Sequence, residues 1–288
     1  MKLIDGISIA KTIQERIKSS IAKFKNRPPG LAFVRIGDNP ASHSYIRMKK
    51  RRCQEVGIVS FDVELPSYVS EIQVILEIKR LNADPAVDGI LVQLPLPEHI
   101  NPSLIMQMID PEKDVDGFNP FNMGKLLLGE SDGFIPCTPH GIHVLLTQSQ
   151  IPLLGKHVVI VGRSNIVGKP LAALLMQKAP HCNATVTLVH SFSEKLEEIC
   201  KQADVLIAAI GKPAFIKKNM VKPHAAVIDV GINHIINNHG EKQIVGDVAF
   251  DEVAPHCSYI TPVPGGVGPM TISMLLTNTL LSYQKKIK

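Results

Sequence analysis

The sequence predicts an α/β fold of two domains, and three observations lead to this prediction. Helical and strand patterns alternate over residues 1–100, which is typical of a parallel sheet covered by helices. The same alternation returns over residues 156–230, where an apolar strand ends at a glycine turn. The chain has 288 residues, which is long for one hydrophobic core. We therefore expect an N-terminal α/β domain, a second Rossmann-like domain with a parallel sheet, and a cleft between them.

The first half of the chain contains three pairs of helix and strand patterns. Isoleucines recur every fourth residue from Ile9 to Ile21, which predicts an amphipathic helix. Asp38 and Asn39 supply capping side chains before Pro40, so a second helix is predicted to begin there. The predicted helices span residues 9–25, 39–55 and 70–81, and the predicted strands span residues 31–37, 58–65 and 87–94.

A segment rich in glycine and proline, residues 111–139, separates the two halves and is predicted to be a loop at the domain boundary. Later strands are predicted over residues 158–161, 185–189, 204–210 and 226–230, with a short one near Tyr259. The final helix, predicted over residues 270–283, is expected to pack back on the first domain. The predicted domains are therefore residues 1–117 plus 270–288 and residues 118–269.

Composition and charge argue against several classes of protein. The net charge is +5 and aromatic residues make up 5% of the chain, which disfavours a nucleic-acid binder and fits an anionic small-molecule ligand. The five cysteines form no C-x-x-C pair, which argues against a disulfide framework or a zinc finger. The N-terminus lacks the apolar core of a signal peptide, and no apolar run approaches the ~20 residues of a membrane span. We expect a cytoplasmic protein that binds neither nucleic acid nor membrane.

The strand at residues 158–161 leads into the most informative motif of the chain. Gly162 ends this strand, and Gly168 opens a helical pattern that continues to Leu175. A strand, a glycine turn and a helix N-terminus form an anion site, because backbone N–H groups and the helix dipole point at the turn. Dinucleotide pyrophosphates are held in this way. The spacing is G-x5-G rather than G-x-G-x-x-G, so an ordinary strand-to-helix turn is the alternative.

The next strand indicates which dinucleotide would fit. NAD sites usually place Asp or Glu after this strand, where the carboxylate binds the ribose 2′-hydroxyl. Here the strand ends at His190 and Ser191, and no carboxylate follows before Glu194. Ser191 suits a 2′-phosphate together with Arg163 of the preceding turn, because a planar guanidinium fits phosphate oxygens. The pattern favours NADP over NAD; the alternative is a solvated arginine and a loop serine.

Tyr45 and Lys49 are four residues apart on the predicted helix 39–55, so they share one face. The tyrosine ring can stack on a flat heterocycle while the lysine reaches its reactive edge. The alternative is that Lys49 only begins the charged run of residues 49–52. Short-chain dehydrogenases also use Tyr-x-x-x-Lys, but there the motif follows the nucleotide turn, whereas here it precedes Gly162. That family is therefore disfavoured.

Polar residues near the predicted strand ends are further candidates. Gln93 lies where a parallel strand ends, and ligands of such sheets bind outside the carboxyl ends of strands. A merely polar strand end is the alternative. Asp114 and Asp116 stand in a tight turn that lacks the other positions of a calcium loop. One of these carboxylates is expected to accept two N–H groups of a guanidine-like ring edge, unless the pair only forms an Asx-type turn.

Two more segments have an unusual composition. Residues 262–269 contain three glycines and three prolines, which predicts a rigid backbone that another group approaches closely. His140 and His143 have the spacing of a zinc pair, but the sequence offers no third ligand. A structural role is therefore favoured for these histidines, and no metal is expected.

Together, these motifs resemble the bifunctional methylenetetrahydrofolate dehydrogenase/methenyltetrahydrofolate cyclohydrolase family. The similarity runs in order along nearly the whole chain. The matching blocks are residues 45–49 (YIRMK), 89–97 (GILVQLPLP), 111–117 (PEKDVDG), 136–139 (PCTP), 161–170 (VGRSNIVGKP) and 260–271 (ITPVPGGVGPMT).

The resemblance implies a folate-binding substrate domain and an NADP domain that carry two reactions. Hydride would pass from 5,10-methylenetetrahydrofolate to NADP⁺, and water would then open the methenyl ring to give 10-formyltetrahydrofolate. Lys49 is implied in the hydrolysis, with its amine oriented by Gln93. Tyr45 would stack on the folate, and Asp116 would bind the pterin edge. Further implied substrate contacts are Val92, Leu94, Pro264, Gly265, Gly266, Val267 and Gly268, and the implied NADP contacts are Gly162, Arg163, Ser164, Ser191 and Ile232.

The resemblance also implies a homodimer, assembled through the nucleotide domain, that acts on tetrahydrofolate derivatives. Two alternatives stay open. A folate dehydrogenase that uses NAD and has no hydrolase activity would be distinguished by kinetics with both cofactors. A basic nucleotide- or RNA-binding module would show salt-sensitive RNA binding without turnover, and the polar candidate residues argue against it.

Overall fold

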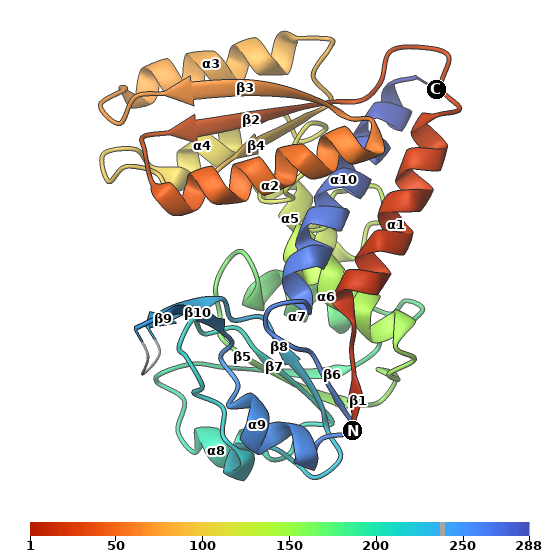
Figure 1. The fold of residues 1–288 in the computed structure, drawn as a ribbon. Helices are drawn as coiled ribbons and strands as arrows, with labels where there is room; N and C mark the ends of the chain where they lie inside the picture. Colours follow the sequence, from red (N-terminus) through yellow and green to blue (C-terminus); the bar gives the residue numbers. More distant parts are fainter. Residues whose placement is uncertain (237–239, 288) are drawn as a thin grey trace. The chain divides into compact units, whose positions relative to one another are not determined.

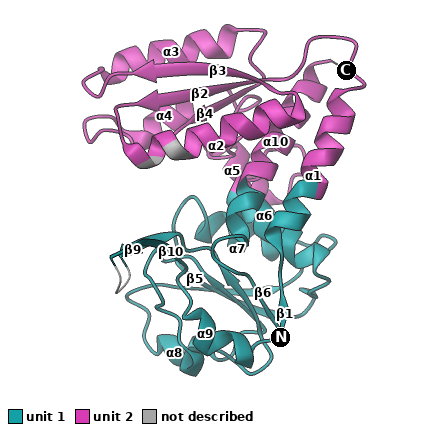
Figure 2. Cartoon of the chain, viewed as in Figure 1, with its two compact units in different colours: residues 1–11, 138–271 teal, residues 12–137, 272–288 magenta. Residues whose placement is uncertain are grey.

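The structure, a computed structural model, describes residues 1–236 and 240–287, apart from the side chains of Ala41 and Ser44. The chain forms two compact units (Figure 2): unit 1 comprises residues 1–11 and 138–271, and unit 2 comprises residues 12–137 and 272–288. Each unit is built on a parallel sheet with helices beside it, as Figure 1 shows. The predicted α/β class, with two sheet-based domains, is confirmed.

The division of the chain differs from the predicted one at residues 1–11, 118–137 and 270–271. Residues 1–11 belong to unit 1, because β1 (Lys2–Leu3) pairs in parallel with β11 (Tyr259–Ile260). Residues 118–137 belong to unit 2, because their side chains bind the aspartate turn that precedes them. Asn122, for example, donates from Nδ2 to Oδ2 of Asp114 at 2.9 Å. Contacts of this kind have no counterpart in local sequence patterns.

Unit 2 contains a three-stranded parallel sheet with the strand order β3-β2-β4. Its strands are β2 (Gly30–Ile36), β3 (Val59–Leu65) and β4 (Gly89–Val92), and its helices are α2 (Pro40–Val56), α3 (Glu71–Ala83), α4 (Pro102–Met108), α5 (Pro120–Leu128) and most of α1 (Gly6–Ile21) and α10 (Val267–Lys286). Ala32 and Val34, on one face of β2, pack with Val74 and Ile78 of α3 in a hydrophobic core. The register places Val34 opposite the last residue of β4, so Gln93 follows at the carboxyl edge.

The segment predicted to be a loop at residues 111–139 contains helix α5 and the start of α6 (Cys137–Gln148). Pro120 and Gly129, two of the residues that suggested a loop, mark the ends of α5. Asn119 caps the helix through its side-chain oxygen, and Pro120 occupies the first helical turn. Gly129 ends the helix in the left-handed conformation, with a φ of 77°. Composition alone does not separate a loop from a short helix with strong start and stop signals.

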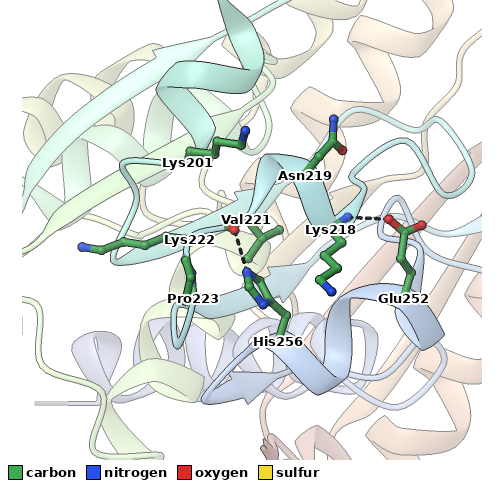
Figure 3. Close-up of a pocket in the computed structure, with 8 residues that line it drawn as sticks. All are labelled: Lys201, Lys218, Asn219, Val221, Lys222, Pro223, Glu252 and His256. Atoms are coloured by element: carbon green, nitrogen blue, oxygen red, sulfur yellow. Dashed lines mark hydrogen bonds between the residues drawn. The ribbon is translucent and has the colours of Figure 1, made fainter.

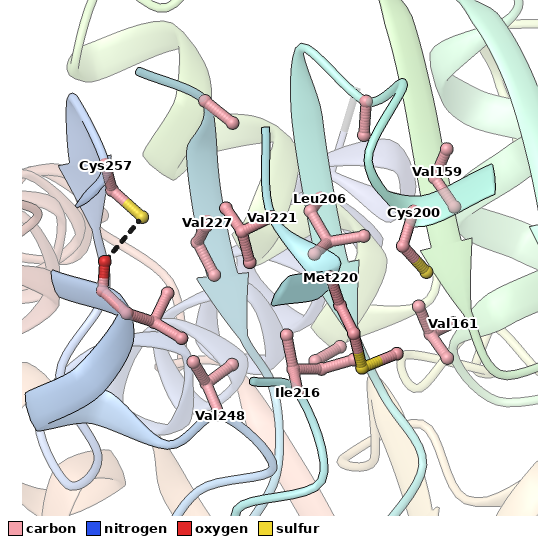
Figure 4. Packing of buried hydrophobic residues seen from close by; sticks show 14 of the residues in the cluster. Val159, Val161, Cys200, Leu206, Ile216, Met220, Val221, Val227, Val248 and Cys257 are labelled. Carbon is pink, nitrogen blue, oxygen red and sulfur yellow. Dashed lines mark hydrogen bonds between the residues drawn. The ribbon is translucent and has the colours of Figure 1, made fainter. Parts of the chain in front are cut away.

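Unit 1 contains a six-stranded parallel sheet with the strand order β1-β11-β8-β7-β5-β6. Its other strands are β5 (His157–Val161), β6 (Thr185–Val189), β7 (Val205–Ala208) and β8 (Ala226–Asp229), its helices are α6, α7 (Gly168–Leu175), α8 (Leu196–Cys200) and α9 (Phe250–Val253), and 3₁₀ turns lie at Lys218–Met220 and Ala254–His256. Strands β9 (Asn233–Ile236) and β10 (Lys242–Val245) form a separate antiparallel pair. Val159, Leu206 and Val227 of neighbouring strands pack with Ile216 and Val248 in a buried core (Figure 4).

The strand registers of unit 1 bring four strand ends to one edge of the sheet. Val161 of β5 lies opposite Val189 of β6 and Ala208 of β7. Ala208 in turn lies opposite Asp229 of β8. Residues that follow these four positions therefore share the carboxyl edge, where ligands of open α/β sheets bind.

Candidate active site

Helix α2 and the end of strand β4 bring two predicted catalytic residues of unit 2, Lys49 and Gln93, into contact. Tyr45 and Lys49 lie one turn apart on α2, and both are half-buried. The Lys49 Nζ donates a hydrogen bond of 3.2 Å to Oε1 of Gln93, the residue after β4. The Gln93 Nε2 donates to the Leu94 carbonyl oxygen at 2.8 Å, which turns the amide oxygen towards the lysine. The strand end thus orients the lysine ammonium.

The four cationic residues of the run 49–52 on α2 differ in the groups that they contact. The next three residues of the run form ion pairs with carboxylates of β3 and of α2 itself. Exposed pairs of this kind contribute on the order of 0–1 kcal/mol to stability. Lys49 differs from its neighbours, because its ammonium contacts Gln93 and interacts electrostatically with the Asp116 carboxylate. Lys49 is therefore the one member of this run that belongs to a cluster of candidate site residues.

The structure separates the roles of the two aspartates in the predicted turn. Asp114 is fully buried, and its carboxylate accepts hydrogen bonds from three backbone N–H groups of residues 117–119 and from Asn122 Nδ2. Burial nevertheless raises the pKa of Asp114 to about 6. Asp114 therefore holds the turn in the Asx-type role, which leaves Asp116 as the candidate for substrate binding.

Asp116 is half-buried and lies beside Lys49 and the Cys137 thiol. Burial raises the pKa of the Asp116 carboxyl group, while the ammonium and the thiol oppose this shift. Cys137 is fully buried, and burial together with the nearby Asp116 charge raises the pKa of its thiol well above the usual range. The thiol is therefore a neutral hydrogen-bond donor and not an activated nucleophile.

Sequence analysis did not single out Cys137 or Asn278 as site residues. Asn278 lies on α10, is buried, and donates from Nδ2 to the carbonyl oxygens of Val115 at 2.9 Å and Ile135 at 3.1 Å. It thereby ties the aspartate turn to the segment that carries Cys137. The PCTP block contains Cys137 and is the signal that could have identified it, whereas no local signal points to Asn278, whose contact with Val115 spans 163 residues.

The two neighbours of Gln93 differ in their accessibility. Val92 is only 2% exposed and belongs to the core formed with β2 and α3. Its side chain is therefore unavailable to a substrate, and the predicted contact of Val92 reduces to its backbone. Leu94 is half-buried, and its carbonyl oxygen already accepts the Gln93 amide.

In unit 1 the turn after β5 requires glycine at both predicted positions. Gly162 has a φ of 125°, and a Cβ there would overlap the carbonyl oxygen of Ala209. A Cβ on Gly168 would overlap the carbonyl oxygen of Gly162, so α7 begins directly against the turn. The Ser164 hydroxyl accepts from the backbone N–H of Val167 at 3.1 Å. Ser164 therefore helps to start α7, and part of its hydrogen-bonding capacity is used within the turn.

Three other predicted NADP contacts lie at the carboxyl edge of the unit 1 sheet. Arg163, Ser191 and Ile232 follow shortly after the ends of β5, β6 and β8, and all three are exposed. Within the described part of the chain, the Arg163 guanidinium has no hydrogen-bond or ion-pair partner. It is therefore available to an anionic ligand at this edge.

The glycine- and proline-rich loop before α10 is shaped by close backbone contacts. A Cβ on Gly6 would overlap the carbonyl oxygen of Gly266. Helix α10 starts before the predicted residue 270, so Val267 and Gly268 form its first turn. A Cβ on Gly268 would lie 3.9 Å from Cδ1 of Ile232. One predicted folate contact and one predicted NADP contact are therefore neighbours in unit 1.

The pocket shown in Figure 3 belongs to the other edge of the same sheet. It is lined by Lys201, Lys218, Asn219, Val221, Lys222, Pro223, Glu252 and His256. Each of these residues lies in a segment that leads into β7, β8 or β11, so the pocket lies at the amino edge. The predicted nucleotide contacts follow strand ends at the carboxyl edge, and the pocket is therefore not the candidate nucleotide site.

His140 and His143, which have the spacing of a metal pair, both lie on α6. His143 Nε2 lies 2.9 Å from the carbonyl oxygen of His181, and the buried Nδ1 of His140 has no partner among the described residues. Residues 1–236 and 240–287 contain no group of three or more His, Cys, Asp or Glu side chains that could hold a metal ion. In the same residues, no helix is long and apolar enough to cross a membrane.

Models of one protein family match both parts of the chain. The tetrahydrofolate dehydrogenase/cyclohydrolase catalytic domain matches residues 4–116. The tetrahydrofolate dehydrogenase/cyclohydrolase NAD(P)-binding domain matches residues 136–287. The first model contains Lys49, Gln93 and Asp116, which together form the Lys49 cluster of unit 2. The second model contains the glycine turn of unit 1.

Individual relatives match over the full length of the chain. The bifunctional protein FolD of Protochlamydia amoebophila is 56% identical over 285 residues, with 98% of both chains covered. The bifunctional FolD methylenetetrahydrofolate dehydrogenase/cyclohydrolase structure from Campylobacter jejuni is 45% identical, with a TM-score of 0.94 and 99% of both chains covered. The Trypanosoma brucei N5,N10-methylenetetrahydrofolate dehydrogenase-cyclohydrolase, complexed with NADP cofactor and inhibitor, is 38% identical, with a TM-score of 0.93 and coverage of 100% of this chain and 98% of that one. The chain therefore belongs to the tetrahydrofolate dehydrogenase/cyclohydrolase family.

Proposed function

We propose that the protein oxidises 5,10-methylenetetrahydrofolate with NADP⁺ and hydrolyses the resulting 5,10-methenyltetrahydrofolate to 10-formyltetrahydrofolate. The observation that carries this proposal is the contact of Lys49 with Gln93 beside Asp116, within the part of the chain that the catalytic-domain model matches. An amine, an amide that orients it and a nearby carboxylate are groups that can move and direct protons during hydrolysis. The relatives from C. jejuni and T. brucei are named for both activities.

Support for NADP comes from the carboxyl edge of the unit 1 sheet. Strand β5 ends at the glycine turn, which leads directly into the N-terminus of α7, and a pyrophosphate can bind to backbone N–H groups in such an arrangement. The exposed Arg163 guanidinium suits a 2′-phosphate, and Ser191 stands where NAD sites usually place a carboxylate. We assign Gly162, Arg163, Ser164, Ser191 and Ile232 to hold this cofactor. When bound, NADP⁺ accepts the hydride that leaves the one-carbon bridge.

We assign the pterin of the folate to Tyr45 and Asp116 of unit 2, and the folate contact of residues 264–268 stays a prediction from the family resemblance. The half-buried tyrosine offers a ring on which a flat pterin can stack. The Asp116 carboxylate can accept two neighbouring N–H groups from the pterin edge. Burial disfavours the charged form of this carboxylate in the free protein, so two such donors would stabilise the charge that binding requires.

We assign Lys49 to the proton transfers of the hydrolysis. Water adds to the methenyl carbon, the bond from that carbon to N5 breaks, and the formyl group remains on N10. One proton of the water ends on N5 and the other is released, so a group beside the bridge has to accept and return a proton. The Lys49 amine fills this role, and its hydrogen bond to Gln93 fixes its direction. Departure of the hydride needs no base, so the oxidation does not depend on the amine in the same way.

The test is a spectrophotometric assay of the purified protein with methylenetetrahydrofolate and each nucleotide. We expect NADPH formation with NADP⁺, slower turnover with NAD⁺, and loss of methenyl absorbance when methenyltetrahydrofolate is supplied without nucleotide. Turnover with NAD⁺ and no hydrolysis would instead indicate a dehydrogenase alone. Light scattering of the same preparation tests the homodimer that the family resemblance implies, and a monomeric mass would contradict it.

A further inference from the structure

Two buried aspartates join the loops behind the candidate nucleotide edge of unit 1. Asp247 is fully buried, and its Oδ2 accepts hydrogen bonds from the backbone N–H groups of Ile210 at 2.7 Å and Gly211 at 2.9 Å. Its Oδ1 accepts from Asn233 Nδ2 at 2.9 Å. These partners follow the ends of β7 and β8. One carboxylate therefore holds two neighbouring loops at the carboxyl edge of the sheet.

Asp229, the last residue of β8, extends this connection. Its Oδ1 accepts from the backbone N–H groups of Gly231 at 3.0 Å and Asp247 at 2.9 Å, and its Oδ2 accepts from Val248 N at 2.9 Å. A Cβ on Gly231 would overlap the Asp247 carboxylate, so the loop after β8 lies directly against it. The two side chains thus fix three segments, which follow β7, β8 and β10.

Burying two carboxylates costs free energy. We take this cost as an indication that the pair is present because it fixes the position of these loops. The Asp247 charge repels the Asp229 carboxylate, and each buried carboxylate loses hydration that only hydrogen bonds can replace. Here six hydrogen bonds from loop groups supply that replacement. The same hydrogen bonds point the amides inward and leave Ile232 exposed beside Gly268. Apolar side chains would fill the space without fixing where each loop lies.

We infer that Asp247 is a positioning residue for the nicotinamide nucleotide, because it fixes the loops at residues 210–211 and 231–233 against which the nucleotide binds. This inference rests on the proposed use of NADP. It adds a residue that lies behind the edge, where it is inaccessible to solvent and acts only through the loops that it holds. The expected consequence is a change in nucleotide affinity that leaves the Lys49 cluster of unit 2 unaltered.

The experiment compares three variants in both reactions. Asp247→Ala should raise the KM for NADP⁺ by about tenfold or more, because several hydrogen bonds to a charged group are lost. Hydrolysis of methenyltetrahydrofolate without nucleotide should stay within about twofold of wild type. Asp247→Asn keeps the shape of the side chain and an oxygen for the loop amides, so its KM should rise by an intermediate factor. The Asp247→Asn variant carries the test if Asp247→Ala does not fold.

Asp204→Ala is the matched control. Asp204 precedes β7 at the amino edge, where its carboxylate accepts from His157 N at 3.0 Å and from Lys222 Nζ at 2.7 Å. Removing it also deletes a carboxylate that holds backbone in unit 1, but at the far end of the same strand. We expect a lower Tm with a KM for NADP⁺ within about twofold of wild type.

The outcomes separate this inference from the proposed function. A KM that stays unchanged in Asp247→Ala and Asp247→Asn, or that rises equally in Asp204→Ala, would overturn the inference. A wild-type protein that binds no NADP⁺ would contradict the proposed function. The nucleotide-free protein gives an independent readout, because hydrogen exchange at the amides of Ile210 and Gly211, which donate to the Asp247 carboxylate, should accelerate in Asp247→Ala but not in Asp204→Ala. Unchanged exchange would show that Asp247 does not hold these loops.

Discussion

In unit 2 the candidate catalytic side chains are held by one another, whereas in unit 1 the candidate nucleotide contacts are exposed and are placed by the backbone behind them. Lys49 contacts Gln93 and interacts with Asp116, and Gln93 is itself fixed by the Leu94 carbonyl. Arg163 and Ser191, in contrast, are exposed residues that follow the ends of β5 and β6.

This difference indicates how each region responds to substitution. In unit 2 the loss of one side chain alters the hydrogen bonding and charge of the next, so effects within the cluster should not be additive. In unit 1 the loss of an exposed side chain removes a single ligand contact and leaves the edge in place. Substitution of a buried residue behind that edge should weaken several ligand contacts at once.

The largest expected effect is on the hydrolysis and comes from Lys49→Met. This change keeps the bulk of the side chain and removes the amine, so methenyltetrahydrofolate hydrolysis should fall by about 10²–10⁴-fold. Dehydrogenase activity should survive in part. Lys50→Met is the control, because Lys50 forms only an ion pair with Asp62 on the helix surface. Methenyl absorbance reports both reactions, and wild-type hydrolysis by the Lys49 variant would remove this residue from the mechanism.

The next effect is on folate use and comes from Asp116→Ala. Loss of a carboxylate that accepts two pterin donors should lower kcat/KM for folate by about 10²-fold in both reactions. Isothermal titration should show nearly unchanged NADP⁺ binding. Asp62→Ala removes a surface carboxylate of the same unit and should leave both properties near wild type. A variant that binds folate normally and loses NADP⁺ would show that the roles of the two units are wrongly assigned.

A smaller effect is expected on cofactor choice from Arg163→Ala. Loss of a charge-assisted contact to the 2′-phosphate should cost about 1.5–3 kcal/mol in NADP⁺ binding and much less in NAD⁺ binding. Lys169→Ala is the control, because Lys169 lies in the same motif and its Nζ donates to Asn165 at 2.7 Å. The KM values for both nucleotides decide the matter, and equal increases would count against a 2′-phosphate contact.

The smallest effect concerns stability and pH in unit 1. Burial lowers the pKa of His140 to about 4, below the ~6.5 of an unfolded histidine. The neutral ring therefore stabilises the fold above pH 6.5, and this contribution is lost as the pH falls towards 4. Between pH 7 and 4.5, wild type should lose about 2 kcal/mol more unfolding free energy than His140→Gln. Urea titrations at both pH values measure this difference, and parallel losses would contradict it.

Some site residues owe their placement to local spacing, and these were predicted well from the sequence. Residues whose placement depends on contacts across the fold were predicted less well. The four-residue spacing of Tyr45 and Lys49 placed them on one helix face, and the strand end placed Gln93 near them. Spacing did not show which of Asp114 and Asp116 is structural. That difference depends on which carboxylate accepts the backbone N–H groups of residues 117–119. It also did not show that the side chain of Val92 points into the core.

Other features escaped prediction because their cause lies far away along the chain. Asn278 reaches the aspartate turn from the last helix, and β1 joins the sheet of unit 1 through pairing with β11. Asp247 lies outside the sequence blocks that resemble the family, although its carboxylate accepts hydrogen bonds from the segments that follow β7 and β8. In each case the partners lie far apart in the sequence, and neither periodicity nor composition indicates such a contact.

We expect the Lys49 cluster and the edge that carries Arg163 to serve different reactions. The most direct measurement is the rate of methenyltetrahydrofolate hydrolysis without nucleotide, determined side by side for Lys49→Met and Arg163→Ala. We expect Lys49→Met to lose this activity by about 10²-fold or more, and Arg163→Ala to keep it within about twofold of wild type. An equal loss in both variants, or a loss confined to Arg163→Ala, would contradict it.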